Sequence, residues 1–177
     1  MTLDGVCDHT AGIPDEELHQ HYAHLLSKAG AVLYGRITYE LMTYWKAVAK
    51  NPTGEKATDE FAVVMNKVPK MVFSRTCKNI DWESATLAGR PLEETVLELK
   101  QQSNKDILVG SRSLIIQLIN LHLIDEFQVC VHPVVAGGGL PLFEDIAQRT
   151  VFTLTKTKTF AGGTVTLYYE PIKKESL

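Results

Sequence analysis

Arginine and hydroxyl side chains follow three short apolar runs in this sequence, at points where a strand gives way to a turn. In the first, Ala31 to Glu40, the apolar run ends at Gly35, and Arg36 and Thr38 open a segment with helical spacing. The start of a helix has unpaired N–H groups and a partial positive charge. Arg36 and Thr38 therefore suit the binding of a phosphate, although an ordinary strand-to-helix turn with a solvated arginine has the same pattern.

The same arrangement recurs twice further along the chain. Ser74 and Arg75 follow the apolar run Lys70 to Phe73, and Gly110 and Ser111 follow a third run. The carboxyl ends of neighbouring parallel strands line one crevice, so Arg36 and Arg75 could converge on a single ligand. Taken alone, an arginine such as Arg75 is more often a loop charge, and helix capping alone would explain Ser111.

Three histidines raise the question of a metal site. His21 and His24 can share a helical face, but His19 points away from that pair. No carboxylate is placed to complete a set of ligands. We therefore expect no bound metal.

Composition limits the class of protein. The 177 residues are enough for one domain with a continuous core, and we expect a single domain over residues 1–177. A formal net charge of −3 and a pI near 6.1 argue against nucleic-acid binding. No apolar run approaches the roughly 20 residues that span a bilayer, so we expect a soluble, cytoplasmic protein with no membrane partner. Reduced, structural thiols are expected at three widely separated cysteines, Cys7, Cys77 and Cys130.

Strands and helices alternate over the first two thirds of the sequence. Apolar spacing, turn residues and prolines predict strands at 31–34, 70–73, around Trp82 within 80–87, and at 107–109. The same signals predict helices at 15–29, 37–48, 55–66, 91–101 and 114–121. After these come strands alone, at 124–135, 140–143, 151–160 and 164–169, with the last two forming a hairpin. The predicted fold class is α/β, with a mostly parallel central sheet, antiparallel C-terminal strands and helices on both faces.

Four segments together resemble a known family. They are LDGV at 3–6, LYGRITYELMTYW at 33–45, VFSRT at 72–76, and DILVGSRSLIIQLINLHLIDEFQVCVHPVVAGGGLPLF at 106–143. In order and spacing they resemble the dihydrofolate-reductase-like family, within it the branch of the C-terminal reductase domain of the riboflavin-biosynthesis protein RibD. The resemblance covers nearly the whole chain and implies a three-layer fold that binds NADPH.

The resemblance also assigns residues to the cofactor. Those matching the family's NADPH-binding positions are Gly35, Arg36, Thr38, Ser74, Arg75, Gly110, Ser111 and Leu114. The first three match the helix start that binds phosphate, and the next two match the loop at the adenosine 2′-phosphate. The last three match the turn beneath the pyrophosphate and the nicotinamide ribose. That turn is commonly Gly-Gly in the riboflavin enzymes, and Ser111 departs from it.

The catalytic side carries fewer matches. Dihydrofolate reductases have a carboxylate on the first helix, and the comparable region here, residues 18–20, contains none. Asp4, in the LDG segment, is the remaining acid expected to border the substrate, unless it only caps the turn before Gly5. Tyr44 and Trp45 are expected to form walls of the substrate pocket.

These expectations define the activity. We expect an NADPH-dependent reductase of a pyrimidine- or pterin-like substrate, similar to the reductase acting on 5-amino-6-(5-phosphoribosylamino)uracil. The alternatives are a weak or altered dihydrofolate reductase and a nucleotide-binding protein without catalysis. The resemblance also implies a homodimer.

Overall fold

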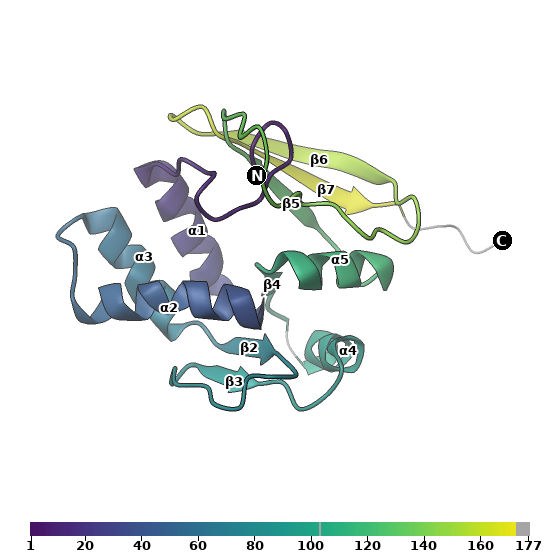
Figure 1. Cartoon of the computed structure of the whole chain (residues 1–177), viewed down its shortest axis with the longest axis horizontal. Helices are drawn as coiled ribbons and strands as arrows, with labels where there is room; N and C mark the ends of the chain where they lie inside the picture. Colours follow the sequence, from purple (N-terminus) through teal and green to yellow (C-terminus); the bar gives the residue numbers. More distant parts are fainter. Residues whose placement is uncertain (103, 173–177) are drawn as a thin grey trace. The chain divides into compact units, whose positions relative to one another are not determined.

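A computed structural model describes residues 1–102 and 104–172 of the chain (Figure 1). The chain groups into two compact units. One comprises Glu16–Ile115, and the other comprises Met1–Asp15 together with the chain from Ile116 onward. Because the second boundary falls inside a helix, the unit boundaries do not coincide with loops. The expected single-domain organisation stays a prediction.

The unit Glu16–Ile115 holds a four-stranded parallel sheet in the order β3-β2-β1-β4. Its strands are β1 (Ala31–Gly35), β2 (Lys70–Phe73), β3 (Ala85–Leu87) and β4 (Ile107–Val109). The helices that begin in this unit are α1 (Glu16–Lys28), α2 (Arg36–Lys50), α3 (Lys56–Lys67), α4 (Leu92–Gln102) and α5 (Arg112–Asn120). Strand and helix therefore alternate as predicted.

Burial of β1 identifies it as a central strand. Residues Ala31 to Tyr34 are buried in succession, although neighbouring side chains point to opposite faces of a strand. Both faces of β1 are therefore covered, which is typical of strands in parallel sheets. On one face, Val32 and Tyr34 join a core with Phe61 and Met65 of α3. Helix α3 packs against both α1 and α2 (Figure 1).

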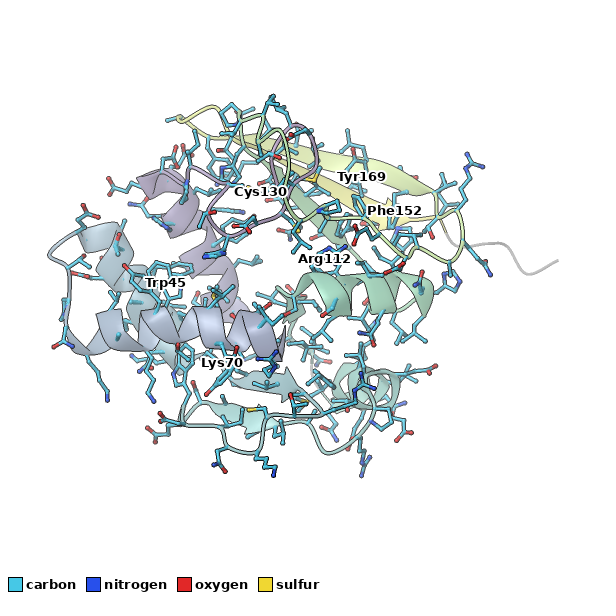
Figure 2. The ribbon with its side chains drawn as sticks, in the orientation of Figure 1. Trp45, Lys70, Arg112, Cys130, Phe152 and Tyr169 are labelled. Carbon is cyan, nitrogen blue, oxygen red and sulfur yellow. The ribbon has the colours of Figure 1, made fainter. Side chains whose placement is uncertain are left out.

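Lys70, at the start of β2, is a buried cation (Figure 2). Its side chain is only 2% exposed, and its Nζ donates hydrogen bonds of 2.8 Å to the Val68 carbonyl and to Ser84 Oγ. The same Nζ lies 4.0 Å from the centroid of the Trp82 ring. Burial lowers the pKa of Lys70 to about 8. A buried charge needs such partners. Because they lie at the end of α3 and in the loop before β3, Lys70 links these two segments.

The second unit contains an antiparallel sheet in the order β5-β7-β6. Its strands are β5 (Phe127–Val131), β6 (Phe152–Thr159) and β7 (Val165–Pro171). β6 and β7 form the predicted hairpin across Gly162 and Gly163. Parallel strands followed by antiparallel ones are thus confirmed, although in the described part of the chain they pair as two sheets.

The predicted strand 124–135 is wrong in its length, since β5 covers only Phe127–Val131. Beyond Val131 the backbone bonds to the N-terminal segment instead of β7. His132 N–H donates to the Met1 carbonyl at 2.8 Å, and Leu3 N–H donates to the Val134 carbonyl at 2.8 Å. Pro133 lacks an N–H and cannot extend the ladder.

Two further strand predictions need correction. Residues 140–143 form no strand, and only a single bridge pairs Pro141 with Val6. Trp82 precedes β3, where its indole N–H donates to Asn66 Oδ1 at 2.7 Å. In both places the backbone is a loop held by individual contacts. The apolar pattern of such a loop does not differ from that of a short strand, so the sequence cannot separate the two.

Candidate functional site

The carboxyl ends of β1, β2 and β4 lie along one edge of the parallel sheet. Gly35 is in register with Phe73, and Leu33 is in register with Val109. The turns that follow these three strands therefore leave the sheet at the same edge. The predicted parallel pairing of these strands is confirmed, and the convergence of Arg36 and Arg75 on one ligand stays a prediction.

A hydrogen bond joins two of the three turns. Gly35 N–H donates to Ser111 Oγ over 2.7 Å, which links the β1–α2 turn to the β4–α5 turn. The Ser111 side chain is 1% exposed. Gly35 has extended backbone angles and no side-chain cap for α2. The bond brings two predicted cofactor residues together and uses Ser111 as an acceptor inside the protein, while their contact with a cofactor stays a prediction.

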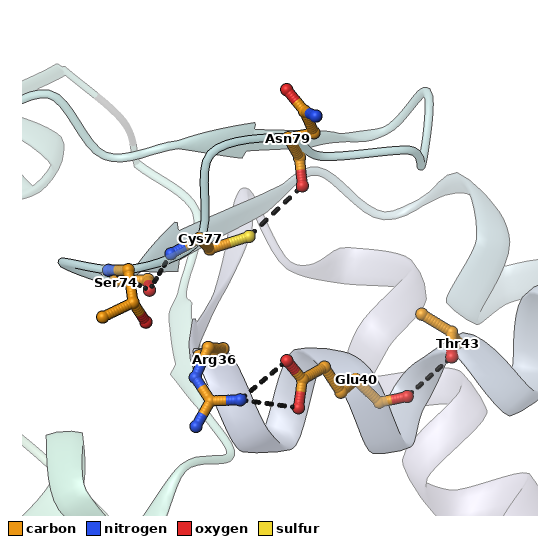
Figure 3. A network of polar contacts seen from close by, with 7 residues as sticks. Arg36, Glu40, Thr43, Ser74, Cys77 and Asn79 are labelled. Carbon is orange, nitrogen blue, oxygen red and sulfur yellow. Dashed lines mark hydrogen bonds and ion pairs between the residues drawn. The ribbon is translucent and has the colours of Figure 1, made fainter.

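Arg36, the first residue of α2, is paired along its own helix. Its Nη1 donates to the two carboxylate oxygens of Glu40 over 2.8 and 3.0 Å (Figure 3). Thr38 lies in the same first turn and is partly exposed. The charge of Arg36 is therefore partly balanced by an acid one turn away.

The loop after β2 is organised by Ser74. Its Oγ accepts a hydrogen bond from the N–H of Cys77 at 2.9 Å (Figure 3). It accepts a second from the N–H of Thr76 at 3.2 Å. The adjacent Arg75 is exposed and forms no hydrogen bond or ion pair within the part of the chain that the structure describes. The loop therefore holds Arg75 on a turn that Ser74 shapes, with its guanidinium available to an anion.

Two predicted cofactor residues have packing roles. A Cβ added at Gly110 would lie 3.2 Å from Tyr34 Cε1, which is tighter than ordinary contact. Leu114, in the first turn of α5, is 4% exposed. The close approach of the Tyr34 ring is thus enough to explain a glycine at position 110. Burial is enough to explain a leucine at position 114, and neither requires a ligand. Their part in cofactor binding stays a prediction.

Trp45 packs between helices (Figure 2). Its ring centroid lies 4.6 Å from that of Phe61 and 6.0 Å from that of His19. The neighbouring Tyr44 is 57% exposed. Both follow Gly35 by about two and a half turns of α2, or roughly 14 Å along the axis. This separation gives the predicted pocket walls no support, and that role stays a prediction.

Asp4 is held by three hydrogen bonds within its own unit. Its carboxylate accepts from Thr2 Oγ1 at 2.5 Å and from the N–H groups of Ala136, at 3.1 Å, and Gly137, at 2.8 Å. These bonds, that from Thr2 foremost, lower the pKa of Asp4 to about 2. Asp4 thus ties the Gly5 turn to the glycine-rich segment, and its catalytic role stays a prediction.

The histidines predicted on the first helix have aromatic neighbours. His19 packs against Phe61, with ring centroids 5.6 Å apart, and His21 packs against Tyr22 at 5.3 Å. Over residues 1–102 and 104–172 no group of three or more His, Cys, Asp or Glu side chains could hold a metal ion. No helix in those same ranges has both the length and the apolar character to cross a bilayer.

His132 was not singled out by the sequence. Its Nδ1 accepts from the Ile13 N–H at 3.3 Å and lies 3.3 Å from Thr164 Oγ1. Burial lowers the pKa of His132. The sequence around His132 does not reveal these contacts, because Ile13 and Thr164 lie in distant parts of the chain.

Comparison with known proteins places this chain in a family. The family model described as the RibD C-terminal domain matches residues 1–166. The chain belongs to the RibD C-terminal domain family. Within this family, a relative is the uncharacterized protein YyaP of Bacillus subtilis (strain 168). It is 36% identical over 173 residues, covering 96% of this chain and 90% of the relative.

Solved structures share the fold of this RibD C-terminal domain. A putative riboflavin biosynthesis protein from Shewanella sp. PV-4 aligns with a TM-score of 0.72 and 17% identity, covering 97% of this chain and 95% of that one. A pyrimidine reductase-like protein from Corynebacterium diphtheriae aligns with a TM-score of 0.65 and 14% identity, covering 98% and 89%. The predicted family and fold are confirmed.

Proposed function

We propose that this protein is an NADPH-dependent reductase of a pyrimidine- or pterin-like heterocycle. The proposal rests on one observation: the turns after β1, β2 and β4 share one sheet edge and carry Gly35-Arg36, Ser74-Arg75 and Gly110-Ser111. In parallel sheets this edge is where nucleotides bind. Membership of the RibD C-terminal domain family supports a reductase.

The helix starts at this edge fit an anionic cofactor. Helix α2 begins directly after β1, and α5 follows β4 after Gly110 and Ser111; neither helix has an acidic residue in its first turn. By contrast, α1 and α4 each have two glutamates there. Acidic side chains would cancel the partial positive charge of a helix start. The edge therefore keeps the potential that a pyrophosphate requires.

Arg75 fits the phosphate that distinguishes NADPH from NADH. Its guanidinium is exposed and lacks an ion-pair partner among the described residues, and it can form two parallel bonds to a phosphate. Arg36 is already paired with Glu40, so it would attract a phosphate less strongly. We therefore assign cofactor selection chiefly to Arg75.

Bound NADPH would supply a hydride, and the protein would supply binding, orientation and a suitable electrostatic environment. Ser74 shapes the loop that presents Arg75, and Ser111 links the turns at Gly35 and Gly110. The named reaction that we favour is reduction of the ribosylamino group of 5-amino-6-(5-phosphoribosylamino)uracil. The favoured substrate class follows from the family.

Anaerobic NADPH consumption, measured against a panel of ribosylaminopyrimidines and pteridines, tests this proposal. We expect oxidation of NADPH with a ribosylaminopyrimidine and a much weaker reaction with NADH. Turnover of dihydrofolate alone would instead identify an altered dihydrofolate reductase. Tight NADPH binding without turnover of any compound would indicate a nucleotide-binding protein and would contradict the proposed activity.

A further inference from the structure

The Ser111 hydroxyl serves a neighbouring turn and not its own helix. Ser111 immediately precedes α5, where a serine side chain ordinarily accepts a hydrogen bond from an N–H of the first helical turn. Here its Oγ instead accepts the Gly35 N–H over 2.7 Å. The N–H groups of Leu114 and Ile115 bond to the backbone carbonyl of Ser111, at 3.0 and 2.9 Å.

This arrangement makes Ser111 a poor candidate for direct contact with a ligand. Its side chain is 1% exposed, and its oxygen is engaged by Gly35. A Cβ at Gly35 would lie 3.6 Å from Ser111 Oγ and 3.4 Å from Ser113 Oγ, which is ordinary van der Waals contact. The two turns therefore lie close to each other at Gly35.

We propose that Ser111 is a positioning residue that fixes the β1–α2 turn against the β4–α5 turn. The Gly35 N–H is the last backbone donor before α2, and holding it orients the start of that helix relative to the start of α5. Both helix starts lie at the edge assigned to the cofactor, so their separation sets how well they bind one anion together. This role rests on the proposed function, because it assumes that NADPH occupies the edge.

Two measurements on Ser111→Ala test the role. Hydrogen exchange of the Gly35 amide, followed by NMR, reports the tether without any ligand. We expect it to accelerate at least tenfold while the amide of Val32, in the same strand, keeps its rate. Titration with NADPH should show a Kd about tenfold weaker, and the rate at saturating NADPH should change little.

Ser27→Ala is the matched control. Ser27 Oγ donates to the His24 carbonyl at 2.8 Å near the end of α1, so this variant also loses one serine hydrogen bond. It precedes β1 and lies away from the carboxyl edge, and it should leave both measurements unchanged. The melting temperature of each variant is recorded, so that general destabilisation is separated from a local effect.

The outcomes are distinct. Unchanged exchange at Gly35 in Ser111→Ala would overturn the tether, whatever happens to NADPH. Faster exchange with unaltered NADPH affinity would overturn its role in positioning the cofactor. Failure of the unaltered protein to bind NADPH would overturn the proposed function and the positioning role with it, while the exchange result would still decide whether the tether exists.

Discussion

One nitrogen of the Arg36 guanidinium, Nη1, donates to both carboxylate oxygens of Glu40, at 2.8 and 3.0 Å, across one turn of α2. Arg75 lies in the loop after the neighbouring strand β2, at the same edge of the sheet, and has no such partner within the described ranges. Two arginines that follow neighbouring strands therefore differ in availability. Their difference leads to the first two predictions.

Arg75→Ala should weaken NADPH binding by roughly 1.5 to 3 kcal/mol, the value of a hydrogen bond to a charged group. Binding of NADH should be almost unaffected, because NADH lacks the 2′-phosphate. Dissociation constants for both nucleotides, measured by fluorescence titration, check this. Lys67→Ala removes an exposed cation just before β2 and serves as the control. Equal losses for the two nucleotides would refute the assignment of Arg75.

Glu40→Gln should tighten NADPH binding by about two- to fivefold, because it releases the Arg36 guanidinium and removes a negative charge near the start of α2. The cost in stability should be small, since exposed pairs four residues apart contribute only about 0.3 to 0.5 kcal/mol. Titration at low salt gives the largest effect. Glu60→Gln breaks the corresponding Lys56–Glu60 pair of α3 and should not alter affinity. Weaker NADPH binding by Glu40→Gln would contradict this prediction and would show that the Arg36–Glu40 pair itself helps to position the binding site.

Asp4→Asn should lower the melting temperature, because an amide cannot replace both accepting oxygens of the carboxylate. If Asp4 also acts on the substrate, turnover should fall by roughly 10²-fold with NADPH affinity unchanged. Normal turnover in the folded variant would leave Asp4 with a structural role alone. Asp8→Asn, which alters another loop aspartate bonded to Thr10, controls for the loss of an exposed charge.

His132 should make stability depend on pH. Burial lowers its pKa below the ordinary 6.5, so the unfolded chain takes up a proton before the folded one does as pH falls. The free energy of unfolding should therefore decrease as pH drops below about 6.5. Asp15 opposes this effect and the N-terminal amine reinforces it.

Urea unfolding between pH 7 and 5 measures this dependence. His132→Gln should flatten the slope, and His9→Gln, which removes an exposed imidazole, should retain it. A slope that is the same in His132→Gln and the unaltered protein would contradict the assignment.

The protein should self-associate. Strand β6 lies at the edge of its sheet, and most of its residues, including Leu154 at 49%, are exposed. Such edges are commonly covered by another chain. Light scattering at micromolar concentration should give about twice the 19.7 kDa mass of one chain. Leu154→Lys should weaken the association, whereas Leu97→Lys, an equivalent change on α4, should not. A monomer at these concentrations would exclude the homodimer.

The sequence by itself determined the order of the elements and the family. Buried runs such as Ala31 to Tyr34 and the apolar spacing of α2 depend on neighbours a few residues away, so periodicity identifies them. The same local signals placed Gly35, Ser74 and Ser111 at strand ends. Parallel pairing then brought those ends to one edge, as predicted.

Only the tertiary structure decided what each side chain does there. The bond from Gly35 to Ser111 spans 76 residues of sequence, and those from Ala136 and Gly137 to Asp4 span 132 and 133. The length of β5 likewise depended on a distant segment, which takes the backbone bonds of His132 and Val134. Hydrogen bonds act over about 3 Å in space irrespective of separation along the chain, so residue type and spacing locate such groups but cannot reveal their partners.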